Sequence, residues 1–211
     1  MMFEGLVRAI TAARFGQGVE RQVGLDEIGG LLTSQAGLQY GWLARNNRIF
    51  GATFGTGTAI APIQATPTTA ADWDLYNGEP DGGRDLYIIQ AGVRSVSGTM
   101  GLGLSLLGCV SLARQTTVPT DYTNSIKTSL TGGPFDSKAI FDQAQTITGG
   151  TPAWITLASR DQVSAVSVGS GLVAVVNGFM KVPPGHVAGF VAMAPAGTNA
   201  LFGVDVVWAE F

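Results

Sequence analysis

The sequence predicts an all-β fold, and three observations lead to this prediction. Thirty of the 211 residues are glycine, and glycine supplies the positive φ of tight turns while it weakens helices. Between the glycines lie short runs rich in Val, Ile, Thr, Phe and Trp, which favour strands. These runs recur about every ten residues without helical periods between them. The pattern is typical of a β-sandwich, jelly roll or closed barrel with about eight to ten strands.

Residues 1–36 differ from the rest of the chain and predict a short helical or extended arm. Phe3, Leu6 and Ile10 would lie on one face of a helix with polar side chains opposite, and Gly16 would end it. An apolar face of this size is too small to stabilise a helix alone. Two alternatives therefore stay open: the arm packs on the end of its own domain, or it docks on a neighbouring subunit.

Residues 37–211 are predicted to form the sandwich domain. Asn46-Asn47 predicts a tight turn between the first two strands. The stretches 85–96 and 102–112 are apolar at successive positions and predict strands that are buried on both faces. The predicted strands and short elements, in order, are 40–45, 48–54, 56–64, 85–96, 102–112, 125–130, 139–147, 153–158, 172–176, 178–182, 187–193 and 201–211.

Charged residues make up only 13% of the chain, about half of the roughly 25% typical of soluble domains. Three explanations compete: residence in a membrane, burial against other subunits, or a surface of uncharged polar residues. The uncharged stretch 95–113 is long enough to span a bilayer, but its glycines and serines favour buried strands instead. We therefore expect no membrane span.

The charge and the cysteine content exclude further classes. A net charge of −3 and the lack of any basic run argue against nucleic-acid binding. Cys109 is the single cysteine, so no internal disulfide can form, and a buried, inert thiol is expected. Glu4 and Arg8 interrupt the apolar segment that a secretory signal would need. These features predict a protein that folds inside the cell.

The chain offers little catalytic machinery. His186, the single histidine, follows Pro183-Pro184-Gly185 and is predicted to lie at a turn or on the surface. Gly169-Ser170-Gly171 lacks the Gly-x-Ser-x-Gly spacing of a nucleophile elbow. The glycines of 101–108 lack the Lys-Ser or Lys-Thr of a phosphate-binding loop. We interpret both segments as turns or strands and expect no catalytic residue, metal or cofactor.

One acidic cluster is the remaining candidate site. It lies in residues 66–85, a stretch dense in turn formers that predicts a long loop. Oxygen-rich loops of this kind can hold calcium, although the spacing misses the EF-hand pattern by one residue. A solvated loop is the favoured interpretation, and glycosidase carboxylates are a weaker one. The acids are Asp72, Asp74, Glu79, Asp81 and Asp85.

The C-terminal segments 182–191 and 201–208 carry a resemblance. Val-Pro-Pro-Gly-His-Val-Ala-Gly-Phe-Val and Leu-Phe-Gly-Val-Asp-Val-Val-Trp resemble the closing strands of jelly-roll virion proteins. Among these are capsid, cement and head-fibre components of bacterial viruses and the trimeric tumour-necrosis-factor-like sandwiches. The resemblance implies a structural subunit, often trimeric, with Phe202-Gly203 near the threefold axis. Asp205 departs from the all-apolar strand of that pattern.

The sequence therefore predicts a jelly-roll-like sandwich that works by assembly rather than by catalysis. We expect a self-associating capsid or capsid-decorating (cement) subunit of a bacterial virus, folded in the host cytoplasm and located in the virion with other virion proteins. The alternative is a carbohydrate- or receptor-binding sandwich such as a fibre tip or adhesin, and a hydrolase using the acidic cluster is a third. The predicted interface residues are Phe3, Leu6, Ile10, Trp42, Trp73, Phe202 and Trp208.

Overall fold

The computed structural model describes residues 40–54, 59–99, 101, 103–122, 125–161, 171–195 and 199–211. The predicted arm, with Phe3, Leu6 and Ile10, lies outside the described residues, as does the Gly-Ser pair at 169–170. The chain divides into two compact units, Met1–Asn46 and Asn47–Phe211. The boundary between them falls ten residues after the predicted end of the arm.

The described part of the first unit holds one helix, α2, Gly41–Arg45. The prediction of a strand over 40–45 is therefore wrong. Leu43, Ala44 and Arg45 are strong helix formers, and this local preference prevails over the aromatic residues that suggested a strand. Asn47 has a φ of 53°, a left-handed conformation that asparagine tolerates after a helix. The chain therefore turns here, but the turn joins a helix to β1 and not two strands as predicted.

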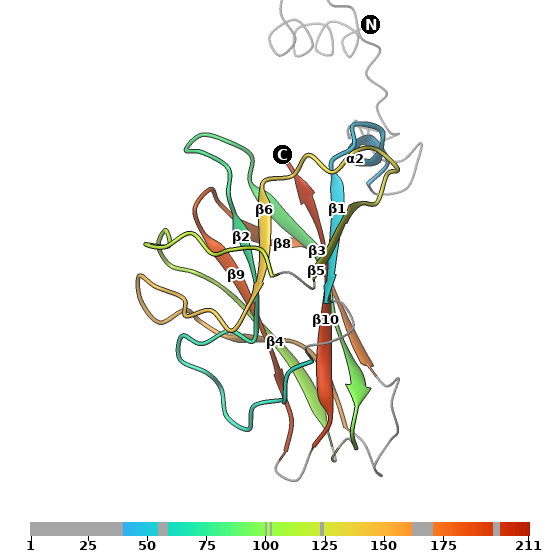
Figure 1. Ribbon diagram of the computed structural model, residues 1–211, viewed down its shortest axis with the longest axis vertical. Coiled ribbons are helices and arrows are strands. Elements are labelled where there is room, and N and C mark those ends of the chain that lie inside the picture. The colour runs from blue at the N-terminus through green and yellow to red at the C-terminus, as the bar shows by residue number, and fades with distance from the viewer. Residues whose placement is uncertain are drawn as a thin grey trace, which may run out of the picture. The chain divides into compact units, whose positions relative to one another are not determined.

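The second unit is a sandwich of two antiparallel sheets, which confirms the all-β prediction (Figure 1). One sheet, here called the β10 sheet, has the order β5-β1-β10-β3-β8, and the other, the β9 sheet, has the order β6-β2-β9-β4-β7. The strands are β1 Ile49–Phe54, β2 Trp73–Asn77, β3 Leu86–Ser97, β4 Leu104–Val110, β5 Ser125–Ser129, β6 Ala139–Gln143, β7 Ile155–Arg160, β8 Gly171–Val182, β9 Val187–Met193 and β10 Leu201–Glu210.

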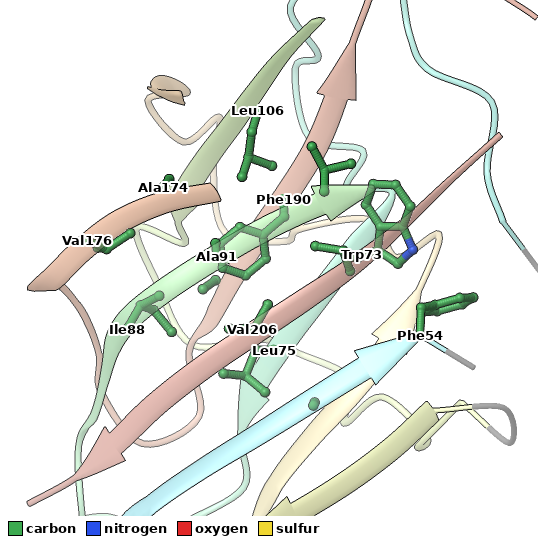
Figure 2. Packing of buried hydrophobic residues seen from close by; sticks show 14 of the residues in the cluster. Phe54, Trp73, Leu75, Ile88, Ala91, Leu106, Ala174, Val176, Phe190 and Val206 are labelled. Atoms are coloured by element: carbon green, nitrogen blue, oxygen red, sulfur yellow. The ribbon is translucent and has the colours of Figure 1, made fainter. Parts of the chain in front are cut away.

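The core lies between the two sheets and draws side chains from both of them. Alternation with a period of two places every second residue of a strand inside. In β8, Ala174 and Val176 point into the core while Val175 points to solvent. Figure 2 shows Trp73 and Leu75 of β2 among the core side chains contributed by the other strands.

A second apolar cluster covers the other face of the β9 sheet. Tyr76, Cys109 and Val187 come from β2, β4 and β9, and they pack with Ala71, Ile147 and Trp154 of the connecting segments. The β9 sheet is thus buried on both faces over these positions. This explains why β9 reads as a continuous apolar run rather than an alternating one.

Two further predictions about the strands need correction. Residues 66–85 contain β2, a strand with all five residues buried, because β6 and β9 pair with its two edges and override its turn-forming Asp and Asn residues. The two strands predicted at 172–176 and 178–182 form one strand, β8. Asn177 and Gly178 adopt positive φ of 51° and 80°, and the register with β3 shifts beside them, as at a β-bulge.

The uncharged stretch 95–113 forms the end of β3 and the whole of β4, so the prediction of buried strands is confirmed there. Within the part of the chain that the structure describes, no helix has the length and apolar character needed to cross a membrane.

Candidate functional site

The predicted acidic cluster does not converge on one point. Asp81 pairs with Arg114, and the Glu79 Oε1 atom lies 2.6 Å from Arg84 Nη2. Asp85 Oδ2 lies 2.7 Å from Lys181 Nζ. Among the described residues, no three His, Cys, Asp or Glu side chains form a group that could hold a metal ion. Glu79, Asp81 and Asp85 therefore form ion pairs at separate places and do not share one site.

Asp74 instead meets an acid that sequence reasoning missed. Asp74 of β2 and Asp142 of β6 are direct partners in the antiparallel register. Because Trp73 and Leu75 point into the core (Figure 2), the side chain between them points to the opposite face of the β9 sheet. Asp74 is 1% exposed and Asp142 is 7% exposed. We call these two residues the carboxylate pair.

Apolar groups flank the carboxylate pair on the side of β9. Gly189 is the β9 partner of Asp74 and contributes no side chain there. A Cβ atom at Gly189 would lie 2.9 Å from Ile147 Cδ1 and 3.1 Å from Trp154 Cη2, so the cover is close. Burial raises the pKa of Asp74 well above its ordinary value, and the charge of Asp142 raises it further.

Asp142 connects the carboxylate pair to a polar cavity. The backbone N–H of Gln143 donates to Asp142 Oδ1 at 2.7 Å, and Gln145 Nε2 donates to Asp142 Oδ2 at 2.7 Å. The cavity has a volume of about 400 Å³, and a second cavity of about 270 Å³ shares part of its lining. The polar residues that line the larger one are Thr117, Thr120, Asp121, Tyr122, Asp142 and Gln145.

Asp72 lies just before β2. Its Oδ2 atom accepts a hydrogen bond of 3.3 Å from the backbone N–H of Ala192. Burial raises the pKa of Asp72 from 3.8 to about 6, and the hydrogen bond from Ala192 opposes part of this rise. Asp72 is therefore a carboxyl group that takes up a proton in mildly acidic solution.

The raised pKa of Asp72 predicts that stability falls as the pH rises. Between about pH 4 and pH 6 the folded state binds more protons than the unfolded state, so the free energy of unfolding decreases with pH. For a pKa of about 6 against 3.8 unfolded, this carboxyl group removes about 2 kcal/mol between pH 4.5 and pH 7. Asp74 acts with the same sign. Urea unfolding at pH 4.5 and at pH 7, with EDTA present to remove metal ions, measures the effect.

The variant Asp72→Asn isolates this contribution, because its side chain cannot titrate. The change in unfolding free energy between pH 4.5 and pH 7 is expected to differ from that of the wild type by about 2 kcal/mol. The exposed acid Asp136 provides the control. Asp136→Asn should show the same change in unfolding free energy between pH 4.5 and pH 7 as the wild type. An equal pH dependence in the wild type and in Asp72→Asn would contradict the prediction.

The other singled-out residues have structural roles in the described chain. Cys109 is buried, which confirms the predicted burial. Burial raises the pKa of its thiol to about 12, which disfavours the reactive thiolate. His186 lies at the turn before β9, where Nδ1 is 3.2 Å from the carbonyl oxygen of Pro184. The predicted turn position of His186 is confirmed.

The predicted interface anchors need correction. Trp73, Phe202 and Trp208 have no exposed surface and belong to the core of the subunit. They cannot touch a partner of the folded chain, because both sheets enclose them. The side chain of Trp42 lies outside the described residues. Any interface on the sandwich must use other side chains.

A signal for the carboxylate pair was present in the sequence. Asp72 and Asp74 alternate with Trp73 and Leu75, which is the period of a strand with an acidic outer face. Asp142 likewise follows the apolar Ile140-Phe141. The turn formers around both segments obscured these patterns. The pairing of one strand with the other could not be deduced from either pattern.

Comparison with known proteins does not assign a family to the chain. No protein-family model matches the chain, and no curated protein shows significant similarity to it.

Proposed function

We propose that this chain is a jelly-roll structural subunit of a viral particle, a capsid or capsid-decorating protein that associates with copies of itself and performs no catalysis. The observation that carries the proposal is the nested pairing of the strands. The first strand of the sandwich pairs with the last, β1 with β10, and β2 pairs with β9. Inside these pairs, β3 pairs with β8 and β4 pairs with β7.

This nesting supports a jelly roll because it describes one long hairpin rolled into two sheets. Successive strands from β1 to β4 and from β7 to β10 supply eight strands, four to each sheet. A double-sheet jelly roll has eight strands and two Greek keys, and it is common in viral capsid proteins. The connection between β4 and β7 supplies β5 and β6, which each extend one sheet by a strand (Figure 1).

The outer face of the β10 sheet supports self-association. At one edge, Val173, Val175 and Phe179 of β8 expose most of their surface. At the other edge, Ile126 of β5 and the following Leu130 are also exposed. We call these five residues the outer apolar face. Exposed apolar side chains at both edges of one sheet favour an interaction site, and an uncovered apolar edge strand otherwise promotes aggregation.

The middle of this sheet is suited to a flat partner such as the same face of a second copy. Gly51 and Gly92 lie between core-facing neighbours and present no side chain on the outer surface. Two charged groups of this sheet are paired, since Arg94 Nε lies 3.9 Å from Asp205 Oδ2. Covering these two described residues would bury them as an ion pair and not as isolated charges, which are more costly to bury.

The variant Val173→Glu tests the assembly directly. The full-length wild type is expected to form closed oligomers of uniform size at micromolar concentration, measured by light scattering after size exclusion. A glutamate on the outer apolar face should weaken association at least tenfold, because its charge would have to be desolvated at the interface. The melting temperature of the separated subunit should change little.

Val118→Glu is the matched control, because Val118 is 61% exposed and Val173 is 62% exposed. Val118 lies on the connection between β4 and β5, away from the outer apolar face, so this variant should assemble like the wild type. A wild type that stays monomeric at micromolar concentration would exclude self-association. Antibody labelling of particles from the source culture tests the virion role, and label confined to cell debris would contradict it.

A further inference from the structure

The carboxylate pair brings two acidic side chains together in a buried position. Opposite positions of an antiparallel ladder bring Cβ atoms to about 4.5–5.5 Å from each other, and Asp74 and Asp142 occupy such positions. The ion pairs of the described residues join Arg and Lys to Glu79, Asp81, Asp85, Asp121, Asp205 and Glu210. None of those pairs neutralises either member of the carboxylate pair.

The Oδ1 atom of Asp74 is the most informative atom of the carboxylate pair. It is buried, and no hydrogen-bond donor of the described residues reaches it. A buried carboxylate oxygen without a partner is strongly unfavourable. The position therefore suits a positively charged ligand between the two side chains.

We propose that the carboxylate pair binds a divalent cation, Ca²⁺, held between Asp74 and Asp142 at the edge of the polar cavity. Gln145 lines the same cavity, and its Nε2 donates to Asp142 Oδ2 and so holds this carboxylate in position. Water in the cavity completes the coordination shell. The assignment does not depend on the proposed assembly, because the pair lies on the opposite sheet from the outer apolar face.

The chemistry of the donors selects the ion. All candidate ligands are oxygen atoms, whereas zinc prefers the nitrogen and sulfur of His and Cys. Ca²⁺ accepts six to eight oxygen ligands in irregular geometry, while Mg²⁺ demands a near-ideal octahedron. Two carboxylates and several waters form a site of low charge. Such a site is expected to bind Ca²⁺ with a dissociation constant of about 10⁻⁴–10⁻³ M.

Binding would also tie together segments that the fold brings near each other. Asp74 lies on β2, Asp142 on β6, and residues 117–122 form the other wall of the cavity. A ligand that binds the folded state alone raises the melting temperature by mass action. The cation should therefore stabilise the β2–β6 edge of the β9 sheet.

Thermal unfolding of the full-length chain tests the proposal. Protein stripped with EDTA is melted at pH 7 with and without 10 mM CaCl₂, and with 10 mM MgCl₂ for comparison. Calcium is expected to raise the melting temperature by about 5 °C or more, and magnesium by less. Asp142→Asn should lose this calcium-dependent rise. Asp136→Asn, which removes an exposed carboxylate, should keep it.

A second readout uses the wild type alone and holds even where a variant fails to fold. Tb³⁺ replaces Ca²⁺ in oxygen-ligand sites and emits when an aromatic side chain close by is excited. Tyr122 lines the adjoining cavity, so sensitised emission that CaCl₂ displaces is expected. An unchanged wild-type melting temperature together with absent Tb³⁺ emission would overturn the assignment. A full calcium response in Asp142→Asn would overturn it too.

Discussion

Replacing Trp208 by alanine is expected to lower the free energy of unfolding by about 3–5 kcal/mol. Trp208 lies in β10, the central strand of its sheet, and has no exposed surface. Its ring stacks on Phe50 with centroids 5.9 Å apart, and its Nε1 donates to Glu210 Oε1 at 3.3 Å. The substitution creates a cavity and removes a hydrogen bond from a buried carboxylate. Urea unfolding followed by circular dichroism measures the loss.

Phe211→Ala is the control for this experiment. Phe211 also makes an aromatic contact, with its ring centroid 5.2 Å from that of Tyr87, but it is exposed. Its removal should cost about 1 kcal/mol or less, as for an aromatic pair at the surface. A Trp208→Ala protein that unfolds like the wild type but loses its oligomeric state would restore Trp208 as an interface anchor and contradict its place in the core.

The second large effect is expected at Arg84, where Arg84→Met should destabilise the fold by about 3–5 kcal/mol. Glu210 has a fully buried side chain, and its Oε2 atom lies 2.8 Å from Arg84 Nη1. Arg84 Nε also donates to Glu79 Oε1 at 2.7 Å. Removing the guanidinium leaves the Glu79 and Glu210 carboxylates without the cation that they share, and the Glu210 side chain has no exposed surface. Urea unfolding at pH 7 measures the cost.

The contact between Arg84 and Glu210 acts mainly through charge. The two groups are close, but no N–H is aligned on Glu210 Oε2 as a hydrogen bond requires. The variant Glu210→Gln therefore should recover much of the stability lost in Arg84→Met when the two changes are combined, because the buried charge is gone. Failure of the double variant to recover any stability would show that lost packing, rather than charge, explains the effect.

Arg94→Met is the matched control for Arg84→Met. Arg94 lies 3.9 Å from Asp205, and both side chains are largely in contact with solvent. An exposed ion pair of this kind contributes at most about 1 kcal/mol. A loss of the same size in the two variants would contradict the claim that burial of Glu210 makes the Arg84 contact important.

The strands that could be predicted are those whose pattern is local and regular. The prediction for β9 coincides with the strand at Val187–Met193, and those for β3, β4 and β10 differ only at their ends. Apolar side chains at successive or alternating positions are sufficient to define such strands. The helix α2 was missed because its five residues are too few for a helical period to emerge.

The sequence by itself determined that this protein is a β-sandwich with few surface charges, because side-chain period and turn residues act over neighbouring positions. The tertiary structure alone decided that Asp74 meets Asp142, that Glu210 is buried against Arg84, and that three aromatic candidates for an interface fill the core. These outcomes depend on strand pairing between distant segments. A period of two tells which residues share a face, and only the register of the sheets tells what that face contacts.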